Sequence, residues 1–433
     1  MPVEKRKPCD LIQLGHNAPK MKVAALIALL SCLLLFGLRQ TTVAAERGAI
    51  KIGFIAPLTG NFARAGMDMV TGAKMFLEEI NYSVAGRKIE LIFEDDAANP
   101  KTAVTKLRKF LDLDKVDMIA GEFLAPCAYA IAPICEEAGI PFINTNAASD
   151  DLTQRKRTKT MIRLCYTSCQ IGHVAGDYAY KKLGWRSVPT LGWEHAFGQE
   201  VIGSFERVFE DAGGRVIQRL YVPLTTLDFS PYVSSLKRYG DGVFTVITGS
   251  ASLRLMKTLK ASGIMDKWKV LTCLTAVDET FLQELGDTAL GVLSIDGYSA
   301  VLDNPANVKF RKRVKDVTRG EANSTILYAY DGLNWISRAL KEVNGDTGDK
   351  NKLMKALRSV EIPDSPRGPM KLDDYGQIVQ NIYVRRVDKV ANYYQNTVLA
   401  TYPMVSQFWT YPPEAFLKEP VYSRDWPACK FCE

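Results

Sequence analysis

The chain has 433 residues, of which 47% are hydrophobic and 24% are charged. Such a composition is typical of a soluble globular protein and excludes a disordered tail protein, a collagen-like chain and a membrane protein with many spans. The formal net charge is +7, but residues 1–45 hold six of the basic and two of the acidic residues, so the rest of the chain carries only +3. The charge gives no reason to expect a nucleic-acid partner, and the length predicts two or three compact units.

A charge-free apolar run extends from Val23 to Leu38 and is followed by the small residues 43–45. This order is typical of a secretory signal, which we assign to residues 1–45, with Met21 as an alternative start. The run is shorter than the ~20 residues that a membrane-spanning helix needs. We therefore expect a periplasmic protein whose mature chain does not span the membrane. A lipid anchor on Cys32 is the competing interpretation.

From residue 50 onward, segments with strand patterns and segments with helical spacing alternate, and only short loops separate them. Apolar residues three and four apart indicate the helices, and short apolar runs indicate the strands. The expected strands lie at residues 50–57, 89–93, 116–120, 141–144, 188–192, 216–220, 243–248 and 269–274. Such alternation predicts an α/β fold with two doubly wound parallel-sheet lobes.

Helical patterns return between residues 304 and 358, after the second series of strands. We therefore predict that the chain crosses back to the first lobe and that several crossings form a hinge. The predicted units are lobe 1 (48–163 plus 298–376), lobe 2 (164–297 plus 377–400) and a C-terminal extension packed on a lobe (401–433), with crossings near 163–170, 295–298 and 374–377.

Seven cysteines follow residue 45, and an odd number cannot all pair within one chain. Cys429 and Cys432 form a CxxC near the end of the chain, and Cys165 and Cys169 lie four residues apart in a predicted loop. Both pairs are candidates for local disulfides in an oxidising compartment, with free thiols as the alternative. We expect no metal site, because the two histidines of this part of the chain are not at ligand spacing from a cysteine pair.

Several short fragments in a fixed order support a family resemblance. They include Ile52–Gly60 (IGFIAPLTG), Glu94–Asp96 (EDD), Gly139–Ile143 (GIPFI), Asp228–Ser230 (DFS) and Tyr328–Asp331 (YAYD). Over roughly residues 48–390, the chain resembles the branched-chain amino-acid (leucine-binding) type of periplasmic solute-binding protein of ABC transporters. The resemblance implies the type I periplasmic-binding-protein fold, a cleft that closes on a small solute, and delivery to an ABC permease and ATPase complex. We expect a monomer without a cofactor.

Enzyme signatures are absent from the sequence. It contains no GxxxxGK[ST], HExxH or GxSxG, and no GxGxxG follows the first strand. His195 beside Glu194 has no obvious nucleophile. We therefore expect no enzyme activity. A secreted α/β hydrolase is disfavoured by the missing nucleophile elbow, and a ligand sensor that signals through a partner remains an alternative.

The resemblance implies that the solute's carboxylate is held in the loops after the third and fourth strands of lobe 1. The family's serine falls at Ala125 and its threonine at about Ala148, so backbone N–H groups would have to hold the carboxylate, with Ser149 as a substitute donor. The alternative is that these small residues only permit close packing. The candidate residues of these loops are Glu122, Ala125, Asn146, Ala147, Ala148 and Ser149.

The family's amine-binding acid would fall near Leu274 or Thr275, where this sequence has no carboxylate. A buried ammonium without a counter-charge costs several kcal/mol. We therefore expect a small carboxylate that is aromatic or otherwise lacks an amine. Asp278 and Glu122 are acids that could compensate, so a branched-chain amino acid or an amide is the alternative solute.

The remaining candidate residues are aromatic or polar and lie in other loops after predicted strands. Aromatic rings there could face a flat, apolar solute, and an arginine could pair with a second anionic group. These candidates are Phe62, Arg64, Phe197, Thr248 and Thr275. The aromatic segment Tyr402–Trp426 is predicted to pack over a lobe, with a permease-docking surface as the alternative.

Overall fold

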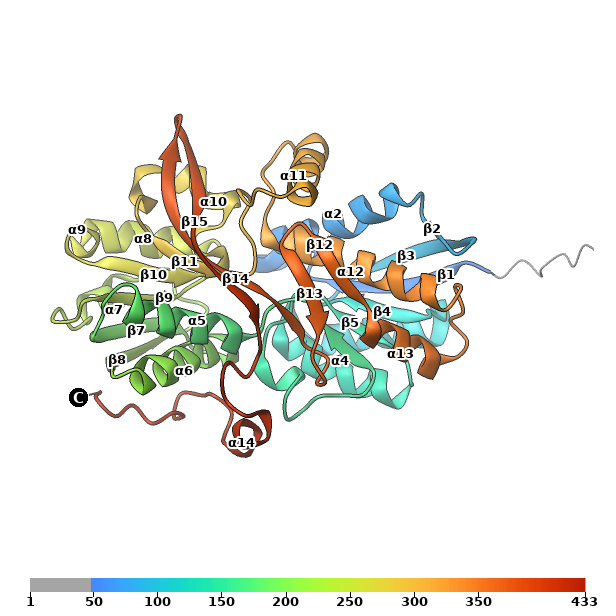
Figure 1. Cartoon of the computed structure of the whole chain (residues 1–433), viewed down its shortest axis with the longest axis horizontal. Helices are drawn as coiled ribbons and strands as arrows, with labels where there is room; N and C mark the ends of the chain where they lie inside the picture. Colours follow the sequence, from blue (N-terminus) through green and yellow to red (C-terminus); the bar gives the residue numbers. More distant parts are fainter. Residues whose placement is uncertain (1–47, 433) are drawn as a thin grey trace, which may run out of the picture. The chain divides into compact units, whose positions relative to one another are not determined.

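The structure is a computed structural model of the chain, and residues 48–432 are described (Figure 1). The signal region assigned to residues 1–45, with the alternative start at Met21 and the anchor at Cys32, lies outside the described residues. The described part contains two β-sheets, and helices cover both faces of each. The expected α/β class with two doubly wound sheets is confirmed.

The first sheet has six strands in the order β2-β3-β1-β4-β5-β6. β1 pairs in parallel with β3 and β4, and the parallel pairing continues through β5 to β6, while β2 runs antiparallel to β3. The carboxyl ends of the parallel strands therefore lie along one edge. The strands are β1 (Ile50–Ala56), β2 (Ser83–Val84), β3 (Arg87–Asp95), β4 (Met118–Gly121), β5 (Phe142–Asn144) and β6 (Met161–Arg163).

Helices from distant parts of the chain cover the first sheet. On one face, α3 (Pro100–Lys109) and α4 (Ala125–Glu137) share a core with β1, β4 and β5. On the other face lie α2 (Ala63–Glu79), α12 (Ser324–Glu342) and α13 (Lys350–Ser359). The approach of α2 to α12 requires glycine at position 72, because a β-carbon there would lie 2.0 Å from a backbone carbonyl oxygen of α12.

The second sheet has the order β12-β13-β14-β11-β10-β9-β7-β8, and β15 also pairs with β14. Strands β7 to β11 are parallel, whereas β14 is antiparallel to β11 and to β15, with which it forms a long hairpin (Figure 1). The strands are β7 (Ser187–Trp193), β8 (Arg215–Val222), β9 (Gly242–Val246), β10 (Lys269–Cys273), β11 (Leu293–Asp296), β12 (Glu361–Ser365), β13 (Gly368–Leu372), β14 (Ile378–Val390) and β15 (Tyr393–Val405).

Helices also cover both faces of the second sheet. One face carries α5 and α6, and the other carries α7 to α10. Apolar residues of these helices pack against alternate sides of the parallel strands, which explains why the strands read as continuous apolar runs. The helices are α5 (Ser168–Lys181), α6 (Ala196–Asp211), α7 (Ser230–Ser234), α8 (Ala251–Ala261), α9 (Ile264–Lys267) and α10 (Glu279–Leu285); α11 (Pro305–Thr318) precedes α12, and α14 (Pro413–Lys418) follows β15.

The chain returns to the first sheet after β11, since α12 and α13 belong to the core of that sheet. It then continues into β12 and β13, whose residues fall within the segment predicted for lobe 1. These strands are hydrogen-bonded to β14 of the second sheet, yet Ile362 and Met370 on them pack in the core of the first sheet. An isolated parallel bridge joins Arg163 to Gln377, in two of the predicted crossings. The lobe boundaries themselves stay a prediction.

The segment that follows β15 lies against α5 and α6. The first five residues of the predicted extension, 401–405, complete β15. Phe408, Phe416 and Tyr422 form a buried cluster with Cys169. Arg207 of α6 forms an ion pair with Glu419.

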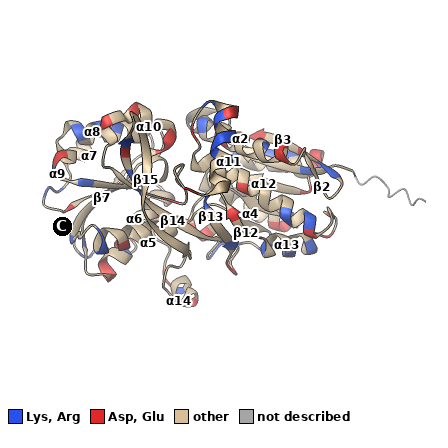
Figure 2. Ribbon diagram, turned by 45° about the horizontal axis from the view of Figure 1, so that its top comes forward, with Lys and Arg blue, Asp and Glu red and all other residues tan. Residues whose placement is uncertain are grey.

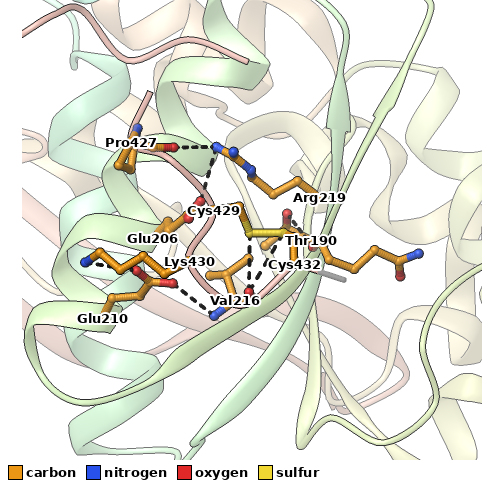
Figure 3. The surroundings of a disulfide bond; sticks show 10 residues. Thr190, Glu206, Glu210, Val216, Arg219, Pro427, Cys429, Lys430 and Cys432 are labelled. Atoms are coloured by element: carbon orange, nitrogen blue, oxygen red, sulfur yellow. Dashed lines mark hydrogen bonds and ion pairs between the residues drawn. A yellow bond between two sulfur atoms is a disulfide. The ribbon is translucent and has the colours of Figure 1, made fainter. Parts of the chain in front are cut away.

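The end of the chain is fixed by a disulfide between Cys429 and Cys432, one of the two predicted pairs (Figure 3). The Sγ of Cys429 lies 3.4 Å from the Val216 carbonyl oxygen, and Arg219 donates to the Pro427 carbonyl oxygen at 2.9 Å. Both contacts hold the tail on β8.

The second predicted disulfide, between Cys165 and Cys169, does not form, and both are buried free thiols. Cys169 lies in the first turn of α5, and its thiol donates to Oδ2 of Asp150 at 2.7 Å. The thiol of Cys165 is directed instead at the Ala147 carbonyl oxygen, at 3.7 Å. The two thiols thus have different hydrogen-bond partners, because Cys169 belongs to α5 and Cys165 precedes it. The spacing of four residues did not indicate this difference.

His173 of α5 is fully buried beneath the tail, and its Nε2 lies 3.1 Å from the Tyr422 hydroxyl. Burial lowers its pKa from 6.5 to about 3, and nearby Arg207 acts in the same direction. The folded state therefore holds a neutral imidazole, whereas the unfolded chain takes up a proton below pH 6.5. The contribution of His173 to stability is constant above that pH and falls as the pH drops towards 3, with a slope of at most ~1.4 kcal/mol per pH unit.

We expect His173→Gln to flatten the dependence of the unfolding free energy on pH between pH 6 and pH 4, measured by urea denaturation. Tyr422→Phe is the control, because it removes the facing hydroxyl and keeps the imidazole. It should retain the slope of the parent protein. An unchanged slope in His173→Gln would show that another group causes the acid sensitivity.

Candidate functional site

The loop after β5 contains the predicted residues Asn146, Ala147, Ala148 and Ser149, and all four are buried. Asn144 shapes this loop: its Oδ1 accepts from the N–H of Ala147 and its Nδ2 donates to the Ala147 carbonyl oxygen, both at 2.9 Å. The Oδ1 of Asn146 accepts from the neighbouring Thr145 hydroxyl at 2.8 Å. The side chain of Asn146 is therefore used inside the loop.

Backbone donors remain at this sheet edge. The N–H groups of Ala148, Ser149 and Ala125 have no hydrogen-bond acceptor within residues 48–432. Ala125 is the first residue of α4, where the helix carries a partial positive charge. The preceding strands β4 and β5 are paired neighbours. These unpaired donors at adjacent strand ends suit a carboxylate.

Ser149 does not offer its hydroxyl to a solute in this structure. The hydroxyl donates to Oε1 of Glu200 in α6 at 2.5 Å and lies 2.9 Å from the Tyr129 hydroxyl. Oε2 of Glu200 accepts from the Asp150 N–H at 3.1 Å and from the Ser168 hydroxyl at 2.7 Å. The predicted substitute donor is thus part of a buried network.

Sequence reasoning missed Glu200, which joins the loop after β5 to α6. Burial raises its pKa well above the ordinary value, and the neighbouring Asp150 raises it further. One feature of the sequence could have identified Glu200: it is an acidic residue in a predicted helix, next to apolar residues such as Val201 and Phe205. The sequence could not identify its partners, because they lie about 50 residues away along the chain.

Glu122 directly follows β4 in the left-handed backbone region, with φ of 71°, and is fully buried. Its Oε1 accepts from the N–H groups of Phe123 at 2.9 Å and Leu124 at 3.1 Å. Burial raises the pKa of Glu122 well above its ordinary value, and Asp96 beside it acts in the same direction. Glu122 is therefore buried and engaged by the backbone of its own loop, and we do not assign it as the counter-charge of a solute ammonium.

Asp96, Glu122 and Cys127 each bring one candidate metal-ligand atom within 4.8 Å of the others, and all three are buried. Burial also raises the pKa of the Cys127 thiol. Metal ions bind thiolates and carboxylates, and both shifts favour the protonated groups instead. We therefore assign no metal to this cluster.

Two predicted residues lie near the end of β1. The ring of Phe62 is half-buried and lies 5.7 Å from the ring of Phe123, between centroids. The exposed Arg64 donates from Nε to Asp68 at 3.2 Å, and Asp68 also accepts from Asn323 at 2.9 Å. Phe62 and Phe123 thus form a small aromatic surface, whereas Arg64 already has a carboxylate partner on its own helix.

The predicted residues of the second sheet fall into two groups. Phe197 is half-buried and stacks on His195, with ring centroids 6.1 Å apart. Thr248 follows β9, and Thr275 lies after β10; the N–H of Gly249 donates to Oγ1 of Thr275 at 3.1 Å. Both threonines keep partial exposure, as a role at an open strand end requires.

The acids at the ends of β10 and β11 are already engaged. Asp278 caps α10, and its Oδ1 accepts from the Thr280 N–H at 2.8 Å. Asp296 is fully buried, forms an ion pair with Arg385 at 3.1 Å and accepts from the Tyr328 hydroxyl at 3.1 Å. Neither carboxylate is available as a counter-charge for an ammonium.

Tyr166, between β6 and α5, is a further candidate that the sequence did not distinguish from other aromatic residues. The residue is half-buried, and its ring lies 5.7 Å from the ring of Tyr328, between centroids. Burial raises its pKa well above the ordinary value, and Asp296 and Cys273 are near enough to contribute. Tyr166 therefore lies close to the ends of β10 and β11 while belonging to a crossing from β6.

The chain forms two doubly wound sheets that are linked by repeated crossings, and half-buried aromatic and hydroxyl groups lie at their strand ends. This arrangement is that of a bilobal solute-binding protein of type I. The chain belongs to the periplasmic binding protein family, which matches residues 49–392. The resemblance identified from the short fragments is thereby confirmed. Within the described residues, no helix is long and apolar enough to cross a membrane.

Similar proteins agree with this assignment. The chain is 30% identical over 384 residues to the Leu/Ile/Val-binding protein homolog 6 of Brucella melitensis, covering 85% of this chain and 95% of the relative. An ABC transporter substrate-binding protein from Sphaerobacter thermophilus has a TM-score of 0.79 at 30% identity, covering 82% of this chain and 98% of that one. The protein is thus a solute-binding protein of an ABC transporter.

Another similar structure was determined with a bound solute. It is a solute-binding protein of an ABC transporter from Rhodopseudomonas palustris BisB5 in complex with 3,4-dihydroxybenzoic acid. Its TM-score is 0.78 at 31% identity, and the match covers 83% of this chain and 98% of that chain. The type I fold inferred from the sequence is therefore confirmed.

Proposed function

We propose that the protein binds a small carboxylate without an amine, such as an aromatic acid, between the strand ends of its two sheets. One observation carries this proposal. Ala125, Ala148 and Ser149 present unpaired N–H groups at adjacent strand ends, while the nearby acids are already engaged: Glu122 accepts from two backbone N–H groups and Asp278 caps α10.

The unpaired N–H groups concern the carboxylate of a solute, and the engaged acids concern its amine. N–H groups at a helix start and in a neighbouring loop can accept a carboxylate without a cationic side chain. A buried ammonium would find no carboxylate free of other partners at these strand ends and would cost several kcal/mol. The site therefore favours an acid over the corresponding amino acid.

The aromatic preference rests on the half-buried rings of Phe62, Phe123 and Phe197 and on Tyr166 near both sets of strand ends. Rings of this kind suit a flat, apolar solute. Similar proteins support the same class: the structure from strain BisB5 holds 3,4-dihydroxybenzoic acid, and one from strain HaA2, at 28% identity, holds p-hydroxybenzoic acid.

A branched-chain amino acid or amide is the second candidate, because one relative is named a Leu/Ile/Val-binding protein homolog and another a leucine-, isoleucine-, valine-, threonine- and alanine-binding protein. This solute would require Glu122 to leave its backbone N–H partners or Asp278 to leave its capping position. Either change would have to accompany binding.

As a transporter component, the protein would close on its solute in the periplasm and deliver it to an ABC permease and ATPase complex as a monomer, after removal of the signal region. No chemical step on the solute is part of this proposal. The C-terminal tail, which packs on α5 and α6, then serves as a structural element of the second lobe.

A thermal-shift screen tests the proposed solute class. Benzoate, 4-hydroxybenzoate and 3-phenylpropanoate are compared with leucine, valine and phenylalanine. A ligand at a hundred times its dissociation constant should stabilise the protein by ~2.7 kcal/mol. We expect shifts with the acids, and shifts confined to the amino acids would contradict the proposal.

A further inference from the structure

A cavity of about 500 Å³ lies away from the candidate solute site, at the amino end of β6 and the carboxyl end of α4. Basic residues dominate its lining. We call it the basic pocket, and it is lined by Glu136, Arg155, Arg157, Thr158, Lys159, Arg358, Asp374 and Tyr375.

Three cations of the basic pocket lack an ion-pair partner. Arg155 pairs with Asp151 at 2.9 Å, but Arg157, Lys159 and Arg358 have no carboxylate within 4 Å among the described residues. Two acids share the lining: Glu136, whose Oε1 accepts from the Lys159 N–H at 2.8 Å, and Asp374. Positive charge therefore remains in excess around one cavity.

Packing holds two of these cations in place. Arg358, in the last turn of α13, a helix rich in basic residues (Figure 2), donates from Nη2 to the carbonyl oxygens of Lys159 at 3.3 Å and Met161 at 3.4 Å. A β-carbon on Gly376 would lie 3.2 Å from its Nη1. Arg157 lies over the ring of Tyr375, 4.9 Å from its centroid. Like charges are thus fixed near one another, and the chain provides fewer acids than cations in the lining.

Thr158 provides an independent observation. Its side chain is 8% exposed, and its Oγ1 is buried with no hydrogen-bond partner within the described residues. A buried hydroxyl without a partner costs roughly 1–3 kcal/mol. An oxygen atom of a bound anion would satisfy this hydroxyl and the unpaired cations together.

We propose that the basic pocket binds a small multivalent oxyanion of the phosphate or polycarboxylate class, at a site separate from the solute site. Planar guanidinium groups suit such ligands, because they can donate two parallel hydrogen bonds. The cavity has room for more than one anionic group, so a diphosphate or a tricarboxylate should bind better than a monovalent acid.

Calorimetry at low salt with inorganic pyrophosphate, citrate and acetate tests the proposal. We expect one site for pyrophosphate or citrate, weakened by added NaCl, and no measurable heat with acetate. Arg157→Gln and Arg358→Gln should each weaken binding at least tenfold. Arg254→Gln, at an exposed position on α8, is the control and should bind like the parent protein.

Thr158→Val keeps the test informative if the arginine variants fold poorly. It removes the unpaired hydroxyl, so the anion-free protein should be as stable as the parent, while the affinity for pyrophosphate falls severalfold. The proposal is overturned if no polyanion gives heat at millimolar concentration. Equal loss in Arg254→Gln, or parental affinity in Thr158→Val, Arg157→Gln and Arg358→Gln together, would also overturn it.

Discussion

Replacing Arg367 by methionine is expected to lower the free energy of unfolding by ~3–5 kcal/mol. Arg367 is 1% exposed, and its Nε pairs with Asp331 of α12 at 2.8 Å. Its Nη1 donates to Gln380 of β14 at 2.6 Å and its Nη2 to the Leu164 carbonyl oxygen at 2.7 Å. One guanidinium thus joins a helix of the first sheet, a strand of the second and a predicted crossing. The variant leaves a buried carboxylate without its charge partner.

Urea denaturation of Arg367→Met measures this effect, and Arg338→Met is the matched control. Arg338 pairs with Asp364 at 3.3 Å on the surface, where ion pairs contribute at most ~1 kcal/mol. Asp331→Asn combined with Arg367→Met should recover part of the loss, because it removes the unpaired charge. A loss in Arg367→Met no larger than that of Arg338→Met would contradict the structural role assigned to this arginine.

Replacing Thr275 by glutamate should reverse the solute preference. The position lies where the resembled family has its amine-binding acid, and in this chain it is half-buried at the end of β10. An aromatic acid that binds next to the new carboxylate would either strip water from it or bring a second negative charge close to it, and both cost free energy. We therefore expect benzoate-like acids to bind at least tenfold more weakly, which is ~1.4 kcal/mol. An α-amino acid would gain the missing counter-charge.

Thr275→Gln separates charge from size, since glutamine has nearly the same shape as glutamate. It should retain most of the affinity for an aromatic acid and gain none for an amino acid. Calorimetric titration of both variants provides the comparison. If the glutamine variant lost as much affinity as the glutamate variant, steric exclusion and not charge would be responsible.

Much of the fold could be predicted because the parallel strands and their helices have local patterns. The apolar runs ending at Ala56 and Gly121 and the helical spacing of residues 304–358 indicated two doubly wound sheets and a return of the chain. The pairing of β12 and β13 with the second sheet was not predicted. β13 is hydrogen-bonded to β14 of the second sheet, whereas Ile362 of β12 and Met370 of β13 pack in the core of the first sheet. A local sequence pattern does not indicate that a strand pairs with one sheet and packs on the other.

The candidate site was harder to predict from the sequence than the fold. The hydrogen bonds and pKa values of its residues depend on contacts with residues far away along the chain. The sequence placed Glu122 and Ser149 in the correct loops. It could not reveal that burial, with Asp96 beside it, raises the pKa of Glu122, or that Glu200 accepts a hydrogen bond from the Ser149 hydroxyl. Both residues were candidates for direct solute contact, and tertiary contacts give each another role.

The proposed solute carries a carboxylate and no amine. Calorimetric titration of the full protein with 3-phenylpropanoate and with phenylalanine isolates this property, because the two ligands differ only in the α-amino group. We predict that 3-phenylpropanoate binds at least tenfold more tightly, a difference of ~1.4 kcal/mol or more. Micromolar binding of phenylalanine, with no heat from 3-phenylpropanoate, would contradict the claim and make Glu122 or Asp278 the residue that holds the amine.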